Sequence, residues 1–390
     1  MPALTTRYFR KKALLLKIET TYGVDANPSA GANAIEIRNV TFTPMQNKNV
    51  DQNIDMPYMG AQVQLPVGTE CKLQFDVAVT GSGTAGVAPA YGPLLRTAGR
   101  SETINAAAVT GTAQAGSANS MTLAVGASAV DDSYKNLTLS ITGGTGSGQT
   151  ARIKSYAGAT KVATFADTLT TPPDATSTYS ILPQVVYAPV SSSFESATIY
   201  FTVDGVQHKL LGVRGDVDTK LPAAGIPVFT FKLDGVYGGI ADVPVPALTM
   251  SAWKIPLPVN NVNTSGFSLH GFATNLYSLD FAGGATVVHR LDVIGVEDIQ
   301  ITDRKMTGNV SIQAPLIAEH DFFTEAKNVT LGSLYLQHGQ TAGNIVHFDH
   351  DSVQVVDPNY EDKNGVVALK MGLRLLPSSL GNDEQIITVR

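Results

Sequence analysis

The stretch Ser196–Tyr237 reads SATIYFTVDGVQHKLLGVRGDVDTKLPAAGIPVFTFKLDGVY and predicts three antiparallel strands. Its first two β-rich runs are separated by Asp204-Gly205, a dipeptide that favours a tight hairpin turn. A Pro/Gly loop, Leu221–Pro227, follows the second run, and the third run alternates apolar with polar or small residues. The predicted strands are Ala197–Val203, Lys209–Val213 and Val228–Leu233.

The same order of elements recurs about 130 positions later, in Leu331–Leu376. There a strand, a Gly turn, a long strand, a loop containing Pro358 and Gly365, and a final strand follow one another. A strand and a short helix with apolar residues three or four apart precede each copy. These are Lys72–Val79 and Ala88–Gly99 before the first copy, and Asn309–Gln313 and Pro315–Lys327 before the second. A duplicated β unit explains the recurrence, whereas chance similarity between β segments is the alternative.

The composition indicates an all-β protein of two or three domains. The chain has 390 residues, of which 43% are hydrophobic and 15% charged, and it is rich in Gly and Pro. Its net charge of −6 provides no basic surface for gripping nucleic acid. Cys71 is the only cysteine, so no disulfide can form within one chain. We expect neither a signal peptide nor a membrane span, because no apolar run is long enough.

The fold class expected is a duplicated β-sandwich or barrel-like domain with one or two short helices and an inserted small β module. Residues 1–106 and 184–252 would form the first unit, and 253–390 the second. Between them, 107–183 is rich in Ala, Gly, Ser and Thr, which indicates a β module inserted at the surface. The Pro-rich segment Val243–Asn261 reads as a stiff linker. In the second unit, AGGA is expected to join strands Leu276–Phe281 and Thr286–Ile294.

Two segments of the first unit are expected to contact other subunits. Residues 1–34 read as an exposed arm, because a basic cluster is followed by a Gly- and Pro-containing stretch. The polar segment Pro44–Leu65 reads as a long loop, and loops of that length tend to be functional. The basic residues of the arm are Arg7, Arg10, Lys11 and Lys12, and the adaptable apolar residues of the loop are Met45, Met56, Tyr58 and Met59.

Motifs that suggest chemistry have simpler interpretations. Gly143–Thr150 has the spacing of a phosphate-binding loop, but Gln149 replaces the required Lys and a strand follows, which favours a Gly-rich β turn. His347 and Asp349 would face one side of a strand and His350 the other, as expected of a solvated strand face rather than a metal site. Asp216–Asp218 and Asp357–Asp362 read as turn residues. We therefore expect no catalytic residue, metal or cofactor.

Several stretches resemble the major tail tube proteins of long, non-contractile-tailed bacteriophages. They are LKIETTYGVDANPSAGANAIEIRNVTFTP (16–44), TGSGTAGVAPAYGPLLRTAG (80–99), SSSFESATIYFTVDGVQHKLLGVRGDV (191–217) and ITDRKMTGNVSI (301–312). The resemblance covers about four fifths of the chain, all of it outside the insertion, which looks like small β modules of phage virion proteins.

The resemblance implies a virion tail protein, assembled in the bacterial host cytoplasm, that forms stacked rings around a channel for the genome. Its partners would be other copies of itself, the tape measure protein, the tail terminator and distal tail proteins, and DNA would pass through without specific binding. Proteins of this kind with one domain per chain build rings of six domains, so a duplicated chain would form a trimeric ring with pseudo-sixfold symmetry. A hexamer is the alternative if the chain is one large domain.

Two functions of other classes remain open at this stage. One is a virion surface protein that binds a receptor or carbohydrate through module 107–183, although that module has few aromatic residues. The other is a carbohydrate-active enzyme on a β scaffold, which would require a defined pair of carboxylates. The sequence marks out no such pair.

Overall fold

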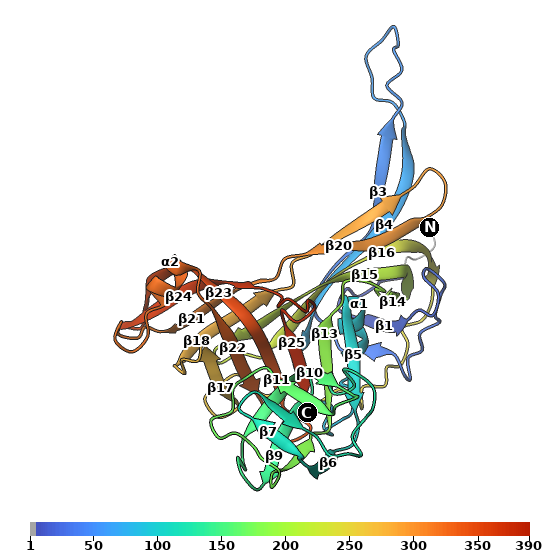
Figure 1. Ribbon diagram of the computed structural model, residues 1–390. Helices are drawn as coiled ribbons and strands as arrows, with labels where there is room; N and C mark the ends of the chain where they lie inside the picture. The colour runs from blue at the N-terminus through green and yellow to red at the C-terminus, as the bar shows by residue number, and fades with distance from the viewer. Residues whose placement is uncertain (1–4) are drawn as a thin grey trace.

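The computed structural model describes residues 5–390, with 51% of residues in strands and 3% in helices. The all-β fold predicted from composition and turn spacing is confirmed. Figure 1 shows a body of curved sheets with a long hairpin projecting from one end and the inserted module at the other. Within the described residues, no helix combines the length and the apolar character needed to cross a membrane.

The first half forms seven antiparallel strands in the order β2-β1-β14-β15-β16-β4-β3. Asp204 and Gly205, at φ of 35° and 93°, make the turn between β14 and β15 that the Asp-Gly pair predicts. Alternate residues such as Phe229 and Phe231 point into the core. The strands are β1 (Lys12–Ile18), β2 (Ala34–Ile35), β3 (Arg38–Asp51), β4 (Gln64–Ala78), β14 (Ala197–Val203), β15 (Val206–Pro222) and β16 (Val228–Asp242).

The second half repeats this arrangement with six strands in the order β17-β22-β23-β24-β21-β18. Each strand has a counterpart in the first half: β17 corresponds to β1, β22 to β14, β23 to β15, β24 to β16, β21 to β4 and β18 to β3. The strands are β17 (Thr264–Leu269), β18 (Leu276–Ala282), β21 (Thr307–Gln313), β22 (Leu331–His338), β23 (Val346–Lys363) and β24 (Val366–Leu375). The two halves thus share one pairing order.

A short helix lies at the same place in each half, but both helices are shorter than predicted. Helix α1 (Gly92–Thr97) follows β4, and α2 (Phe322–Asn328) follows β21. The Asp321 carboxylate caps α2 by accepting a hydrogen bond from the Thr324 backbone N–H at 2.9 Å. Residues 315–320, predicted to be helical, lie outside the helix and contain a turn at 317–319, since this cap fixes the start of the helix after them.

The two halves join through a strand pair. The end of β15, Thr219–Pro222, pairs antiparallel with Ser278–Phe281 of β18, so one sheet continues from the first half into the second. A single hydrophobic core contains buried residues of both halves, including Phe229 and Phe348, whose rings lie 6.2 Å apart. The segment Val243–Asn261, predicted as a linker, has no helix or strand, and the Trp253 indole N–H donates to the Ala34 carbonyl at 3.0 Å.

Two expected loops are parts of long hairpins. Pro44–Leu65 is not a loop throughout, because β3 continues to Asp51, β4 begins at Gln64, and only 52–63 form the tip. AGGA joins β18 to β19 (Ala285–Leu291), as predicted. It forms a bend within one arm of a hairpin, because β19 pairs with β20 (Glu297–Arg304) and not with β18. The second hairpin therefore runs from β18–β19 through the tip 292–296 to β20–β21.

The inserted module folds around its own core in a sheet of order β6-β12-β9-β10-β11-β8-β7. Its strands are β6 (Val109–Thr112), β7 (Ala115–Ser117), β8 (Ser120–Thr122), β9 (Thr138–Gly143), β10 (Thr150–Ala157), β11 (Val162–Phe165) and β12 (Thr178–Ile181). The chain enters and leaves through the paired strands β5 (Arg100–Asn105) and β13 (Gln184–Pro189). Strand β13, expected to belong to the first unit, also pairs with β25 (Ile386–Val389), so it links β5 to the last strand of the second half.

The prediction that residues 1–34 form an exposed arm is wrong for most of residues 5–34, and residues 1–4 lie outside the described part of the chain. Lys12–Ile18 is strand β1, paired with β14 along its whole length, and Ala13–Leu16 are buried. The loop that follows folds against the same chain through Glu19, a buried carboxylate. Glu19 accepts hydrogen bonds from the Ser196 hydroxyl at 2.6 Å, the Thr198 hydroxyl at 2.9 Å and the Gly212 N–H at 2.9 Å.

Replacing this carboxylate should destabilise the fold. The substitution Glu19→Ala is expected to lower the free energy of unfolding by about 3 kcal/mol, because three buried donors lose a charged acceptor. The control Glu36→Ala removes a partly exposed carboxylate paired with Arg38 and should cost less than about 1 kcal/mol. Urea unfolding followed by circular dichroism measures both. Equal midpoints for the two variants would contradict the structural role of Glu19.

Candidate assembly surfaces and polar cavities

The strand pair that joins the halves is formed by the end of β15 and by β18. Their counterparts, the end of β23 and strand β3, each have one edge that pairs with no strand among residues 5–390. In the first half, β14 covers the edge of β15 up to Val213, and β18 covers Thr219–Pro222 beyond it. In the second half, β22 covers β23 up to Gln354, and the same edge of Asn359–Lys363 pairs with no strand among residues 5–390. Strand β3, the counterpart of β18, pairs within the described chain only with β4.

At the junction within the chain, hairpin β19–β20 packs against residues of the first half. The Arg214 guanidinium donates to the Ile299 carbonyl at 2.9 Å, and the Ile299 N–H donates to the Tyr22 hydroxyl at 2.6 Å. His289 of β19 lies 3.5 Å from the Glu70 carboxylate of β4. Ile299 and His289 are both buried. The hairpin of the second half is thus packed against the sheet of the first half.

Among residues 5–390, no segment covers hairpin β3–β4 as the first half covers hairpin β19–β20. From Thr43 to Val67 every residue is exposed except Gln62, which is partly buried, and the hairpin projects away from the body (Figure 1). The four residues predicted to make contacts between subunits lie on it: Met45 on β3, and Met56, Tyr58 and Met59 at the tip. Their exposed fractions are 50%, 48%, 68% and 102%. Exposed apolar side chains at this density are typical of a contact surface.

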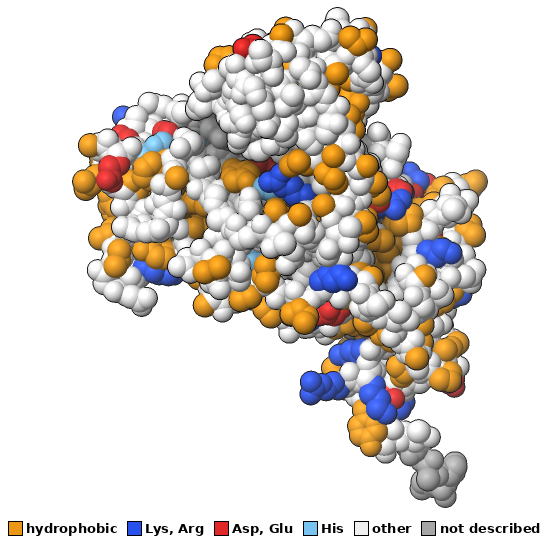
Figure 2. Space-filling model, turned by 90° about the horizontal axis from the view of Figure 1, so that it is seen from below, with side chains coloured by type: hydrophobic (Ala, Val, Ile, Leu, Met, Phe, Trp, Pro, Cys, Tyr) orange, Lys and Arg blue, Asp and Glu red, His pale blue; other side chains and the backbone are white. Residues whose placement is uncertain are grey.

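The basic residues near the N-terminus contact their own chain. Arg7 Nε donates to the Asp204 carbonyl at 2.9 Å, and Lys11 Nζ lies 3.5 Å from the Asp204 carboxylate, at the turn between β14 and β15. Lys12 begins β1, its Nζ lies 3.6 Å from the Phe9 ring centroid, and Arg10 is exposed. Figure 2 shows Lys and Arg side chains gathered on this part of the surface. The predicted contact with a neighbouring subunit remains a prediction, whereas the contact with the chain's own turn is observed.

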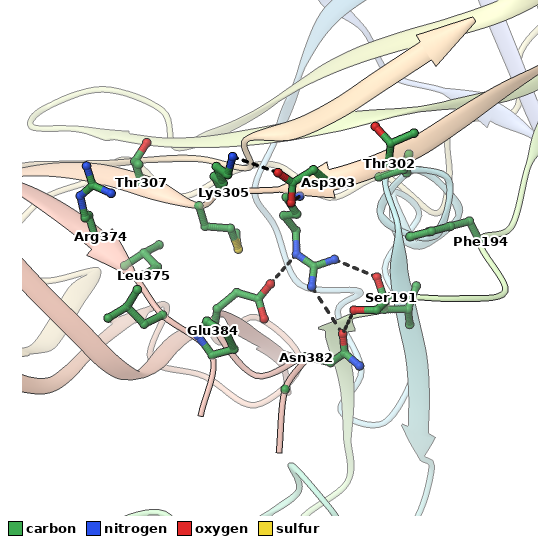
Figure 3. A pocket seen from close by; sticks show the side chains of 17 residues that line it. Ser191, Phe194, Thr302, Asp303, Lys305, Thr307, Arg374, Leu375, Asn382 and Glu384 are labelled. Atoms are coloured by element: carbon green, nitrogen blue, oxygen red, sulfur yellow. Dashed lines mark hydrogen bonds and ion pairs between the residues drawn. The ribbon is translucent and has the colours of Figure 1, made fainter. Parts of the chain in front are cut away.

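A cavity of about 450 Å³ lies where the second hairpin bends. Arg304, at the end of β20, forms an ion pair with Glu384 and donates to the Val190 carbonyl at 2.8 Å. The Ser191 hydroxyl donates to the Asn382 side chain at 2.5 Å, and Figure 3 shows these groups converging. These contacts tie the segment after β13 to the segment before β25. We interpret this cavity as part of the framework that holds the hairpin.

A second cavity, of about 390 Å³, lies between the inserted module and the second half. Arg152 of β10 and Asp167, which follows β11, line it from the module; Asp349 and Asp351 line it from β23. Arg152 forms an ion pair with Asp351 across the gap. The Tyr335 hydroxyl and His347 Nδ1, both on the second half, lie 2.8 Å apart. Charged and polar side chains from two parts of the chain thus meet in this cavity.

The expectation of a solvated strand face at His347, Asp349 and His350 is wrong. Strand β23 pairs here with both β22 and β25, so both histidines are buried. Burial lowers the pKa of each histidine to about 3. Burial, together with the neighbouring Asp351 and Asp167 carboxylates, raises the pKa of Asp349 to about 7, although Arg152 and Arg390 act in the opposite direction.

The remaining motifs have structural roles. The Gly-rich segment Gly143–Thr150 is the turn between β9 and β10, as predicted, and Gly144, Gly146 and Gly148 have positive φ. Asp216–Asp218 lie within β15, not in a turn, and Asp218 pairs with Lys232 at 2.6 Å. Asp357–Asp362 lie within β23, also not in a turn. In residues 5–390, no three His, Cys, Asp or Glu side chains converge in a way that could hold a metal ion.

Comparison with known proteins adds no family: no protein-family model and no curated protein matches this chain.

Most residues that meet in the second cavity could not be predicted from the sequence. Arg152, Asp167, Tyr335 and Arg390 come from separate regions and fall in no motif. The one available signal was the pair of acidic residues flanking His350 in a strand otherwise rich in apolar residues. Charged groups in such a strand indicate either an exposed edge or a buried polar site.

The raised pKa of Asp349 should make stability depend on pH. Its pKa in the folded protein lies above the value of about 3.9 in unfolded chains, so its protonated form stabilises the fold below that value. This contribution is lost as pH rises through about 7. Relative to Asp349→Asn, the native protein should therefore lose at most about 4 kcal/mol of unfolding free energy between pH 4 and pH 8.

Urea unfolding at several pH values measures this difference, and taking it between two variants removes the opposite effect of the buried histidines. The control Asp357→Asn changes an exposed carboxylate of the same strand. A stability difference between native protein and Asp349→Asn that stays constant with pH would contradict the prediction.

Proposed function

We propose that this chain is a structural virion protein that polymerises into stacked rings and forms the tail tube of a long-tailed bacteriophage, the conduit for its genome. The observation that carries the proposal is the junction β15–β18 within the chain, together with its two unpaired equivalents. Asn359–Lys363 of one copy would pair with β3 of the next, as Thr219–Pro222 pairs with Ser278–Phe281. Such pairing uses the same surface at every step around a ring.

The exposure of apolar residues on the two unpaired surfaces supports this assembly. The end of β23 and the start of β24 expose Tyr360, Val366 and Val367 at 60%, 46% and 57%. Hairpin β3–β4 exposes a second apolar set: Met45, Val50, Leu65 and Val67. Within the chain the corresponding hairpin residues, such as Ile299, are buried against the other half. A neighbouring copy would bury the exposed set in the same way and remove two open sheet edges.

Three chains would close the ring in this proposal. Each chain supplies two halves of the same strand order, and a ring of six such halves has pseudo-sixfold symmetry. The proximal part of hairpin β3–β4 would pack on the neighbouring chain, as β19–β20 packs on the first half. The tip at 52–63, with Met56, Tyr58 and Met59, would extend beyond the ring to the next one. A net charge of −6 suits a conduit that must not retain DNA through its phosphates.

Cross-linking tests the proposed sheet pairing. The double variant Thr41→Cys, Tyr360→Cys, treated with a short bis-maleimide, should give covalent dimers and trimers on denaturing gels, because β3 and the end of β23 meet between copies. Native Cys71 is buried, which limits background reaction. Each single variant is a control and should stay monomeric. Monomers alone from the double variant, under conditions in which the protein assembles, would overturn the pairing.

Electron microscopy tests the ring and its stacking. Averaged images of assemblies should show three protruding modules per ring, since each chain carries one module. Replacing 54–62 by a two-residue Asn-Gly turn should leave rings that fail to stack, because the tip that reaches the next ring is gone. Six modules per ring would exclude the trimer. Unchanged tubes from the shortened variant would exclude the tip as the contact between rings.

A further inference from the structure

The cavity between the inserted module and the second half has the features of a ligand site rather than of a packing defect. Its volume of about 390 Å³ lies in the range of small-molecule sites. Three carboxylates and two guanidinium groups line it: Asp167, Asp349, Asp351, Arg152 and Arg390. Arg152 and Asp167 come from the module and the other three from the second half, so two separately folded cores form opposite walls.

Several buried polar atoms on these walls have no hydrogen-bond partner among residues 5–390. They are Asp351 Oδ2, His347 Nε2 and Arg390 Nε. His347 is 4% exposed, and its other nitrogen, Nδ1, is already engaged by the Tyr335 hydroxyl. Buried polar groups are nearly always paired in native proteins. These atoms are shielded from solvent, so they mark the walls of the cavity as polar, and the direct contacts to a molecule inside come from the side-chain groups that line it.

The lining excludes most classes of ligand. Arg152 and Arg390 face three carboxyl groups, so the lining has no excess of positive charge to favour an anion, and Ala151 and Leu334, its only aliphatic residues, give little support to a hydrophobic molecule. Among the described residues, no set of three ligating side chains is arranged for a metal ion. Arg152, already paired with Asp351, and Arg390 offset most of the negative charge that would favour an organic cation. A neutral molecule rich in hydroxyl groups fits, because each hydroxyl can donate to a carboxylate and accept from a guanidinium or imidazole.

We propose that this cavity binds one or two sugar rings of a neutral saccharide, with the Tyr335 ring beside the sugar and the carboxyl oxygens of Asp349 and Asp351 accepting from its hydroxyls. Binding would depend on the docking of module 107–183 against the second half, because each supplies one wall. The module would then serve to complete a saccharide site on the outside of the assembly. This proposal is independent of the ring assembly, since a single chain contains the whole cavity.

Saturation-transfer NMR on the full chain tests the proposal. The probes are glucose, galactose, N-acetylglucosamine, maltose and lactose, with ethanolamine as a cationic competitor. At least one saccharide should give a signal, and Ser333→Phe should abolish it by filling the cavity from its wall. The matched control Ser191→Phe makes the same change in the other cavity and should keep the signal.

At pH 8, where Asp349 is ionised, Asp349→Asn keeps the shape of the side chain and should weaken binding at least fivefold. If Ser333→Phe does not unfold cooperatively on heating, that variant is not properly folded, and the Asp349→Asn variant then decides the test. Absence of signal from every saccharide would overturn the proposal. So would a signal that survives Ser333→Phe in a folded protein, an affinity unchanged in Asp349→Asn, or binding of ethanolamine alone.

Discussion

The pairing of Thr219–Pro222 with Ser278–Phe281 is the contact on which the rest of the structure depends. It makes two similar halves into one continuous sheet and sets the second hairpin against the first half, where Ile299 and His289 are buried. The cost of leaving strand edges open explains why this contact matters. Each half alone would expose one edge at the end of its long strand and another along its outer hairpin, and an exposed edge associates with whatever strand is available.

The parts of the fold that were predictable from sequence are those where local chemistry and burial agree. Asp204-Gly205 adopts the positive φ values of a hairpin turn, and Ala197–Val203 is a strand with the predicted bounds, because the turn residues and the β-branched and aromatic composition of the run favour the same structure. The strands within Pro44–Leu65 could not be predicted, because both faces of that hairpin are exposed in one chain and its residues therefore show no hydrophobic periodicity. AGGA was correctly expected to join two strands, but the glycines alone do not distinguish a bend within one arm of a hairpin from a turn between paired strands.

The candidate sites were less predictable, since they depend on contacts across long sequence separations. His347, Asp349 and His350 look like a solvated strand until β25, from the end of the chain, pairs with the same strand as β22. Arg152 meets Asp351 only because the inserted module docks on the second half. By contrast, the exposed residues Met56, Tyr58 and Met59 could be singled out, because an apolar side chain in a polar segment is conspicuous without any knowledge of its partners.

The differences between the halves follow from where each half can tolerate extra chain. The module is connected to the rest of the chain by β5 and β13, which pair with each other. Its two ends are therefore adjacent, and the insertion does not interrupt the core that the two halves share. The elongated tip 52–63 sits on the hairpin that has no cover within the chain, whereas the hairpin buried against the first half has only the short tip 292–296. Duplication thus supplies the repeated sheet, and divergence is confined to surfaces that the internal junction leaves exposed.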